Sequence, residues 1–144
     1  MKSIIFNTED VLAWIEGSKK LHFVKMRKQP VIRGGVWYPH DKAVRAFYYA
    51  SEKHFRERVA KNFSPFRPGE KVYIRETYCC QWNGSKYEIL YRATLPILYR
   101  DFTWVWKPPL YMREIDSRFH AIIKSVRPEE IDGVWFWRIE IEED

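Results

Sequence analysis

The chain has 144 residues, 46% apolar and 17% aromatic, with 25 lysines and arginines against 19 acids and a formal net charge of +6. This length predicts a single domain over residues 1–144, and the composition excludes a disordered chain. The positive charge favours an anionic partner, with nucleic acid as the first candidate, but does not establish one.

Several kinds of protein are disfavoured by simple features of the sequence. No apolar run approaches the roughly 20 residues of a membrane span, and residues 1–7 are too poor in apolar side chains for a signal peptide. We therefore expect a cytoplasmic protein with no membrane partner. Cys79 and Cys80 are adjacent and lack C-x-x-C or H-x-x-H neighbours, so neither a disulfide framework, a metal nor a cofactor is expected.

Hydrophobic periodicity and turn residues predict an α+β chain. Asn7 can cap the first helix, whose apolar stripe is Val11, Leu12 and Ile15, and Asp41 can cap the second. Two helices among five or six strands with short connections favour a small mixed β-barrel. The predicted elements are a strand at 2–6, a helix at 8–16, a strand within 18–28, a loop at 29–39, a helix over roughly 42–61, a strand at 71–78, a hairpin turn at 82–85, a strand at 87–94, an irregular segment at 95–110, a strand at 118–126, a turn at 127–133 and a strand at 134–141.

The segment 67–78 is the central strand of this prediction. After a Pro-Gly turn its residues alternate, so that Val72, Ile74 and Glu76 point to the same face, toward the core. A buried unpaired carboxylate costs several kcal/mol. Glu76 is therefore expected either at the open mouth of the barrel, near Arg75, or against a cation.

Two groups of charged residues are candidates for function. Lys19 follows the helix stop at Gly17, where an ammonium beside the carbonyl end of a helix forms an anion-binding corner; the alternative is a solvated basic strand. Arg75 with Glu76 could orient a base or a ribose, or transfer a proton. The alternative for Glu76 is an ordinary ion pair with Lys19 or Arg118.

A third group interleaves aromatic and basic residues between positions 104 and 118. Trp104 and Trp106 are followed by Lys107, Arg113 and Arg118. Aromatic rings beside cations are what base stacking and phosphate contact require. The alternative is that the tryptophans cover the core.

Three short blocks of the chain resemble ASCH domains, a phage and prophage family of the PUA-like superfamily. The blocks are Ile5–Glu9 with Gly17 and Lys19, then Pro68–Glu70 with Tyr73–Thr77, then Trp106–Pro109 with Met112, Ser117 and Arg118. The resemblance implies a PUA-like β-barrel whose cleft binds RNA or a nucleotide. It places the ligand-binding residues at Lys19, Arg75, Glu76, Ser117 and Arg118.

The expected function is accordingly binding of RNA, a nucleotide or single-stranded DNA in a basic cleft. Lys19 and Arg118 would contact phosphate, Glu76 would bond to a base or sugar edge, and Arg75 would orient Glu76. One branch of the superfamily is similar to an N4-acetylcytidine amidohydrolase with the motif G-x-K-x-x-T. Here His22 stands at the threonine position, which favours binding over hydrolysis; in an enzyme, the catalytic candidates would be Lys19 and Glu76.

A further alternative is a phage protein-protein interaction module. Its contact surface would be the aromatic side chains that the sequence concentrates near its C-terminal half. Exposure of these side chains would favour this function, because large apolar patches mark partner sites. The residues concerned are Trp104, Trp106, Trp135 and Trp137.

Overall fold

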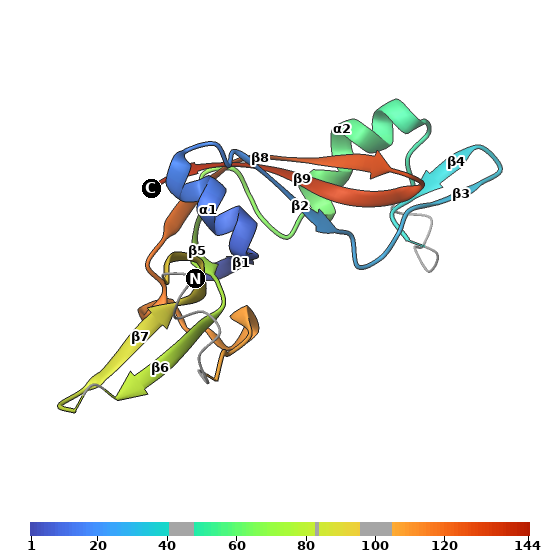
Figure 1. The fold of residues 1–144 in the computed structure, drawn as a ribbon. Coiled ribbons are helices and arrows are strands. Elements are labelled where there is room, and N and C mark those ends of the chain that lie inside the picture. Colours follow the sequence, from blue (N-terminus) through green and yellow to red (C-terminus); the bar gives the residue numbers. More distant parts are fainter. Residues whose placement is uncertain (41–47, 83, 96–104) are drawn as a thin grey trace. The chain divides into compact units, whose positions relative to one another are not determined.

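The computed structural model describes residues 1–40, 48–82, 84–95 and 105–144, and shows an α+β protein with two α-helices and three sheets (Figure 1). Its contacts divide it into two compact units. Unit 1 is Met1–Lys20, Lys71–Ile122 and Glu143–Asp144, and unit 2 is Leu21–Glu70 and Ile123–Glu142. A single domain over the whole chain stays a prediction.

Unit 1 is built around a parallel pair of strands. The register of β1 with β5 places Ile4 opposite Ile74, and β5 pairs on its other side with the start of β8 in antiparallel fashion. The elements of this unit are β1 (Lys2–Ile5), α1 (Thr8–Glu16), β5 (Lys71–Arg75), β6 (Tyr78–Trp82), β7 (Tyr87–Tyr91), three 3-10 turns (Arg92–Thr94, Pro109–Tyr111 and Glu114–Asp116) and the first residues of β8 (His120–Ile131).

Helix α1 begins and ends where the sequence predicts. The Asn7 side chain accepts a hydrogen bond from the Asp10 amide at 2.7 Å, and the Asp10 carboxylate accepts one from the Asn7 amide at 3.1 Å. Gly17 ends the helix with φ of 83°, a conformation that glycine adopts without strain. A capping box and a left-handed stop are both local signals, which is why the helix could be predicted.

The buried face of α1 differs from the predicted stripe. Val11 and Trp14, three residues apart, are the buried pair, and the Trp14 ring contacts the Phe6 ring at 5.9 Å. Leu12 and Ile15 are 40% and 49% exposed, so the predicted stripe is wrong at these two positions. The large Trp14 side chain and Val11 define the face of α1 that packs on the core. Leu12 and Ile15 each follow one of these residues by one position and therefore lie on a neighbouring face of the helix.

Strand β5 is buried on both faces, not on one. Val72, Tyr73 and Ile74 are 0%, 5% and 0% exposed. The alternation puts Tyr73 on the face opposite to Val72 and Ile74, which a half-buried strand would turn toward water. On its own face Tyr73 is covered by Arg75, which donates to the Tyr73 hydroxyl at 3.2 and 2.8 Å and lies 5.4 Å from the centre of its ring.

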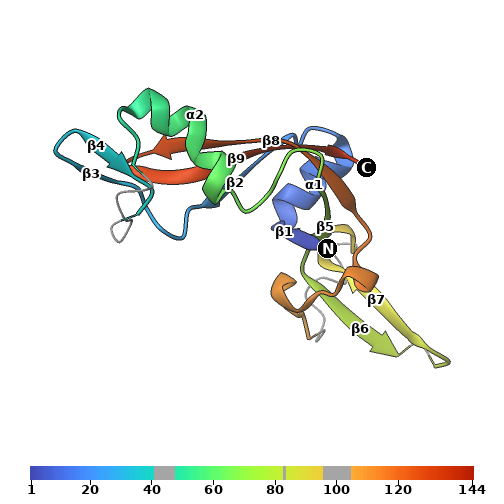
Figure 2. The same cartoon turned by 180° about the vertical axis from the view of Figure 1, so that it is seen from behind.

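Unit 2 consists of an antiparallel ladder covered by a helix. Strand β2 pairs with β9, with Phe23 opposite Arg138, and α2 lies beside β9 in both views (Figures 1 and 2). The Phe55 ring of α2 contacts the Trp135 ring of β9 at 5.1 Å. The elements are β2 (Leu21–Lys25), β3 (Val31–Arg33), β4 (Val36–Tyr38), α2 (Glu52–Phe63), most of β8 and nearly all of β9 (Val134–Glu143). The predicted inward face of the last strand is confirmed, since its four residues Trp135, Trp137, Ile139 and Ile141 are all buried.

The predicted loop at 29–39 is wrong, because it contains the β3–β4 hairpin. Gly34 and Gly35 have φ of 56° and 78°, which is the positive φ that a two-residue hairpin turn needs at both positions. The Gly-Gly signal was present in the sequence, but the flanking strands of three residues are too short to show an alternation.

Helix α2 starts later than predicted. Trp37 and Tyr49 exchange two backbone hydrogen bonds, at 2.9 and 2.7 Å, which holds Tyr49 extended. Ser51 then caps the helix by accepting from the His54 amide at 3.1 Å. The predicted cap Asp41 and the following residues 42–47 lie outside the described residues.

The predicted turn at 127–133 is confirmed only at its last two residues. Strand β8 continues to Ile131, and the turn is the two-residue Asp132-Gly133, with φ of 50° and 79°. Pro128 misled the prediction because proline usually ends a strand. The register of β8 with β5 covers only His120 to Ile122, so Pro128 stands beyond that pairing, where a missing N–H is tolerated.

The predicted barrel is not found among the described residues. The three sheets have the strand orders β1-β5-β8-β9-β2, β3-β4 and β6-β7, and none of them closes on itself within the described ranges. The hairpin predicted around Trp82 is confirmed as β6–β7, which projects as a ribbon in Figure 1. No helix in the described part of the chain is long and apolar enough to cross a membrane.

Candidate functional site

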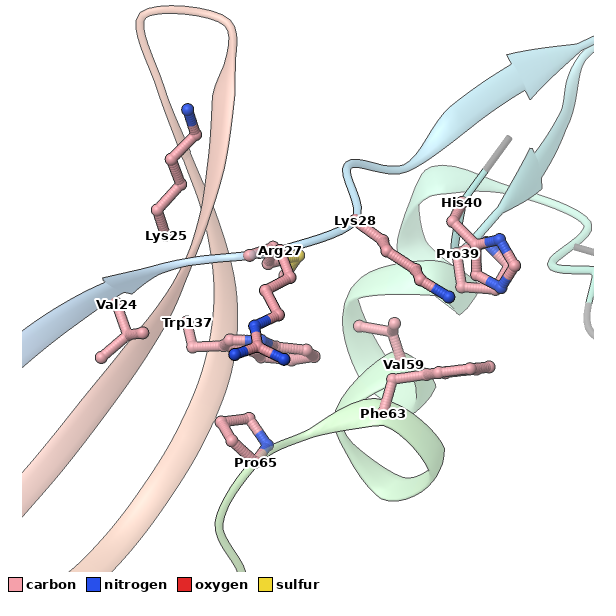
Figure 3. A pocket seen from close by; sticks show the side chains of 11 residues that line it. Val24, Lys25, Arg27, Lys28, Pro39, His40, Val59, Phe63, Pro65 and Trp137 are labelled. Atoms are coloured by element: carbon pink, nitrogen blue, oxygen red, sulfur yellow. The ribbon is translucent and has the colours of Figure 1, made fainter. Parts of the chain in front are cut away.

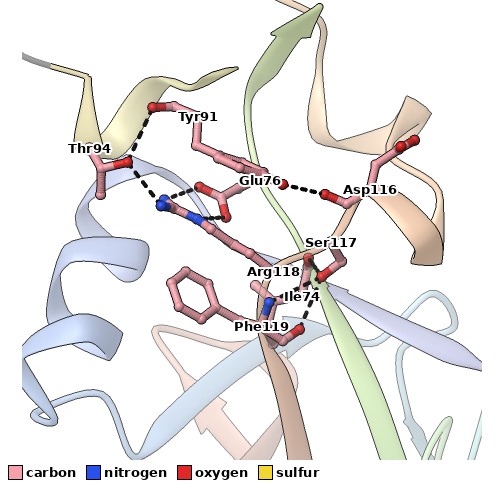
Figure 4. Close-up of polar contacts among 8 residues, drawn as sticks. All are labelled: Ile74, Glu76, Tyr91, Thr94, Asp116, Ser117, Arg118 and Phe119. Atoms are coloured by element: carbon pink, nitrogen blue, oxygen red, sulfur yellow. Dashed lines mark hydrogen bonds and ion pairs between the residues drawn. The ribbon is translucent and has the colours of Figure 1, made fainter. Parts of the chain in front are cut away.

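Glu76, which follows β5 directly, is buried with a cation. It is 1% exposed. Arg118 donates from Nε to one carboxylate oxygen at 2.9 Å and from Nη2 to the other at 2.8 Å (Figure 4). This two-pronged geometry is the strongest form of an arginine-carboxylate pair. Of the two positions predicted for Glu76, the structure shows the one against a cation, and the cation is Arg118.

Arg118 is also held by its other neighbours. Its guanidinium lies over the Tyr91 ring at 4.2 Å and the Phe119 ring at 4.7 Å, and Nη1 donates to the Thr94 hydroxyl at 2.9 Å (Figure 4). Arg118 keeps 23% of its side chain exposed. Its polar contacts therefore tie β7 and the following turn to β5, which is a structural role for a residue predicted to bind phosphate.

Ser117 joins the segment before β8 to the central strand. Its hydroxyl lies 2.7 Å from the Ile74 carbonyl and 3.0 Å from the Phe119 carbonyl. Beside it, Tyr91 donates from its hydroxyl to the Asp116 carbonyl at 2.7 Å (Figure 4). These contacts hold residues 116–119 against β5 and β7.

Lys19 contacts its own helix. The ammonium lies 3.0 Å from an Asp10 carboxylate oxygen and 5.5 Å from the centre of the Phe6 ring, and the side chain is 15% exposed. Asp10 belongs to the first turn of α1, so the ammonium reaches back along the helix from its C-terminal end. The polar contact described for Lys19 is thus with Asp10 and not with Glu76.

Arg75 supports a different segment from the one predicted. It donates from Nε and Nη2 to the Tyr73 hydroxyl at 3.2 and 2.8 Å, and from Nη1 to the Leu110 carbonyl at 2.8 Å. Orientation of Glu76, predicted for Arg75, is carried out by Arg118. The structure therefore brings Glu76, Ser117 and Arg118 together, and gives Lys19 and Arg75 other partners.

Unit 1 also contains a hollow of about 570 Å³, here called the unit 1 hollow. Seven of its nine lining residues, including Trp106, Lys107 and Arg113, belong to the aromatic-basic segment 104–118 that the sequence singled out. Tyr78 and Cys80 come from β6, and no signal in the sequence placed them there. The hollow is lined by Tyr78, Cys80, Val105, Trp106, Lys107, Pro108, Tyr111, Arg113 and Asp116.

The wall of the unit 1 hollow is held by a backbone bridge. Tyr78 and Lys107 exchange backbone hydrogen bonds at 3.3 and 2.7 Å, and the Tyr78 hydroxyl donates to the Tyr111 carbonyl at 3.0 Å. Arg113 pairs with Asp116 at 2.9 Å. The polypeptide on both sides of the hollow is therefore fixed before any ligand arrives.

Cations accompany the aromatic rings of this hollow. The Lys107 ammonium lies 6.0 Å from the Tyr78 ring centre, and the Arg92 guanidinium lies 5.7 Å from the Trp106 ring centre. Tyr111 is 66% exposed and the Arg113 side chain 76% exposed. The Tyr111 ring and the Arg113 guanidinium are thus both accessible to solvent at this hollow. Trp104, the other tryptophan of the segment, lies outside the described residues.

Two tyrosines near these contacts stay protonated at neutral pH. Burial, followed by the charge of Asp116, raises the pKa of Tyr78; burial, followed by the charge of Glu76, raises the pKa of Tyr91. Both can therefore donate the hydrogen bonds described above.

Burial likewise raises the pKa of the Cys79 thiol. The described residues contain no group of three or more His, Cys, Asp or Glu side chains placed to hold a metal ion.

The raised pKa of Tyr91 predicts a loss of stability in alkali. A group whose pKa is higher in the folded state stabilises the fold fully below its unfolded pKa, about 10 for tyrosine, and that contribution disappears as the pH rises through the folded value. Urea unfolding across this range should show a smaller alkaline decline for Tyr91→Phe than for the unchanged protein. Tyr48→Phe, at an exposed tyrosine, is the control; the same decline in all three proteins would contradict the prediction.

Comparison of the chain with protein-family models, curated proteins and solved structures gave no match.

Proposed function

We propose that this protein binds single-stranded RNA or a nucleotide in the unit 1 hollow, as a domain related to ASCH domains and to their PUA-like barrel. The observation that carries the proposal is the pairing of aromatic rings with cations around one hollow in unit 1. An unpaired base offers a flat face to a ring, and its phosphate offers a negative charge to a neighbouring lysine or arginine.

The rings of the hollow suit base stacking. Tyr111 is 66% exposed, and Trp106 is partly exposed. The volume of about 570 Å³ lies within the range of pockets that hold small ligands. A single base or a short stretch of unpaired RNA would fill it, whereas a duplex would present no free base face.

The cations of the hollow suit phosphate. Lys107 is exposed, and Arg113 is largely exposed beside Asp116. The hydrogen bond from Arg113 to Asp116 raises the pKa of the guanidinium further, so Arg113 stays charged at any ordinary pH. Arg75 adds a third positive charge close by, because it binds the Leu110 carbonyl next to Tyr111.

The buried pair of Glu76 and Arg118 supports this function by holding the wall of the hollow in place, and not by contacting the ligand. Arg118 links β5 to Tyr91 and Thr94, and Tyr91 in turn holds the Asp116 carbonyl, which belongs to the lining of the hollow. We therefore propose that the pair stabilises the part of the wall that contains Asp116. Direct contact of Glu76 with a base would first require the structure around it to open, because the residue is 1% exposed.

Neither alternative function gains support of this kind. A hydrolase would need Glu76 free to move a proton, but the carboxylate is buried and occupied by Arg118. A protein-binding surface built on Trp135 and Trp137 would need these rings exposed, but they are 5% and 6% exposed.

Binding should depend on salt through the cations of the hollow. For single-stranded nucleic acid, the logarithm of the affinity falls with the logarithm of the salt concentration by about 0.7 per phosphate neutralised. Lys107→Ala/Arg113→Ala should therefore weaken binding of labelled single-stranded RNA and reduce this slope by about 1.4. Fluorescence anisotropy titrations at several salt concentrations measure both quantities.

Lys61→Ala is the matched control, because Lys61 is an exposed lysine at the end of α2, outside the lining of the unit 1 hollow. Competition with a mononucleotide and with single-stranded DNA distinguishes the possible ligands. Absence of RNA and nucleotide binding, or an unchanged slope in the double variant, would rule out the proposal.

A further inference from the structure

Unit 2 contains a second hollow, of about 450 Å³, between β2, β9 and α2 (Figure 3). We propose that it binds a small amphipathic anion, a molecule with an apolar body and a single carboxylate, sulfonate or phosphate. None of its lining residues belongs to the unit 1 hollow, so this proposal is independent of the RNA-binding function.

The floor of this unit 2 hollow is apolar. Met26, Val59 and Trp137 line it and are 4%, 2% and 6% exposed. Phe63 and Pro65 add further apolar surface at the end of α2 (Figure 3). Because Met26, Val59 and Trp137 are already buried, the apolar surface that a ligand body would remove from water belongs to the partly exposed Val24, Phe63 and Pro65, at roughly 25 cal/mol per Å².

The rim of the hollow is positively charged. Lys25, Arg27 and Lys28 line it, all three are exposed, and none of its 11 lining residues is acidic. They come from the basic segment 18–28, whose charge the proposed RNA site does not use. Three cations beside an uncharged apolar floor attract an anion, because exposed like charges near one another are relieved by a counter-charge.

The floor and the rim together define the class of ligand. An inorganic anion would neutralise the rim but leave the partly exposed apolar side chains of Val24, Phe63 and Pro65 in water. An uncharged apolar molecule would cover the floor but leave the rim unneutralised. Only a molecule that carries both features matches the lining, and a volume of about 450 Å³ holds one of small-ligand size.

A pair of fluorescent probes tests both features at once. Anilinonaphthalene sulfonate carries a naphthalene body and a sulfonate, and N-phenyl-1-naphthylamine carries the same rings without the charge. Fluorescence titration should show that the sulfonate probe binds about tenfold more tightly than the neutral one, since a charge-assisted contact contributes about that factor. Rising salt should reduce this difference.

Charge reversal on the rim should remove the preference. Arg27→Glu/Lys28→Glu should weaken binding of the sulfonate probe at least about tenfold, because about one charge-assisted contact is lost, and should leave binding of the neutral probe unchanged. Lys53→Glu is the matched control, because Lys53 is 84% exposed on α2 and does not line the hollow. The titrations use Lys107→Ala/Arg113→Ala as the background, so that the unit 1 hollow, whose rings and cations could also take an aromatic sulfonate, contributes little to the difference.

Competition then identifies the source of the anion. Displacement of the sulfonate probe by decanoate points to acyl carboxylates, and displacement by a mononucleotide points to aromatic phosphates. Displacement by neither would overturn the proposal. Equal affinity for the two probes, no binding of either, or no effect of Arg27→Glu/Lys28→Glu would overturn it as well.

Discussion

Replacement of Arg118 by methionine is expected to lower the free energy of unfolding by about 3–5 kcal/mol at neutral pH. Glu76 is 1% exposed, and both of its carboxylate oxygens accept hydrogen bonds from Arg118. Removal of the guanidinium leaves this carboxylate buried without a partner, which is far more costly than the pair is favourable. Urea denaturation measures the change.

Two further variants show whether the cost comes from the unpaired charge. Glu76→Gln/Arg118→Met removes both charges and should recover more than half of the loss. Glu52→Gln breaks a pair of similar length, 2.8 Å to Arg56, and leaves Arg56 over the Trp135 ring; both side chains of the pair are about half exposed, so it should cost roughly 0.5 kcal/mol or less. Equal losses for Arg118→Met and Glu52→Gln would show that burial of the Glu76 pair is not what stabilises unit 1.

Removal of two rings from the unit 1 hollow should abolish most of the RNA affinity. Stacking contributes about 1–3 kcal/mol per base, so Trp106→Ala/Tyr111→Ala should weaken binding of single-stranded RNA by at least thirtyfold, an estimate from about 2 kcal/mol. Anisotropy titration at fixed salt measures the affinity, and circular dichroism confirms that the variant folds.

The β6–β7 hairpin offers a matched pair of rings for this experiment. Trp82 and Tyr87 are 57% and 73% exposed, and their ring centres lie 5.1 Å apart. They are aromatic and accessible, but neither lines the unit 1 hollow. Trp82→Ala/Tyr87→Ala should therefore bind RNA as the unchanged protein does. A loss as large as that of Trp106→Ala/Tyr111→Ala would show that any exposed ring serves and that the hollow has no special role.

The elements that could be predicted are those that carry their own local signals. Helix α1 has a capping box at Asn7 and a left-handed glycine at its end, and the sequence between β6 and β7 contains the Asn-Gly signal from which the hairpin was predicted. The inward face of β9 follows from an alternation sustained over a long strand. In each case the residues that decide the structure lie within a few positions of one another.

The sequence-based predictions are wrong where a contact with a residue outside the element determines its bounds or its buried face. Tyr49 is held extended by Trp37, so the second helix begins only at Glu52. Trp14 takes the buried face of α1 from Leu12 and Ile15 because it packs on Phe6. Neither partner could be identified from periodicity within the element concerned.

The candidate site shows the same division. That Glu76 needed a cation followed from one strand, since a carboxylate on a buried face must be neutralised. The choice of Arg118, and not Arg75 or Lys19, depends on how segments far apart in the chain pair with β5. The contribution of Tyr78 to the unit 1 hollow depends on its bridge to Lys107, which no local pattern announces.

The pairing of early strands with late ones governs how this protein must be synthesised. Ile4 of β1 lies opposite Ile74, and Phe23 of β2 lies opposite Arg138. A nascent chain therefore cannot complete the ladder of β2 until β9 has left the ribosome, and ordering that depends on such distant partners is slow. Until then its apolar strands stay exposed, so chaperones should matter most during translation, and a premature stop before Val134 should yield a polypeptide that aggregates.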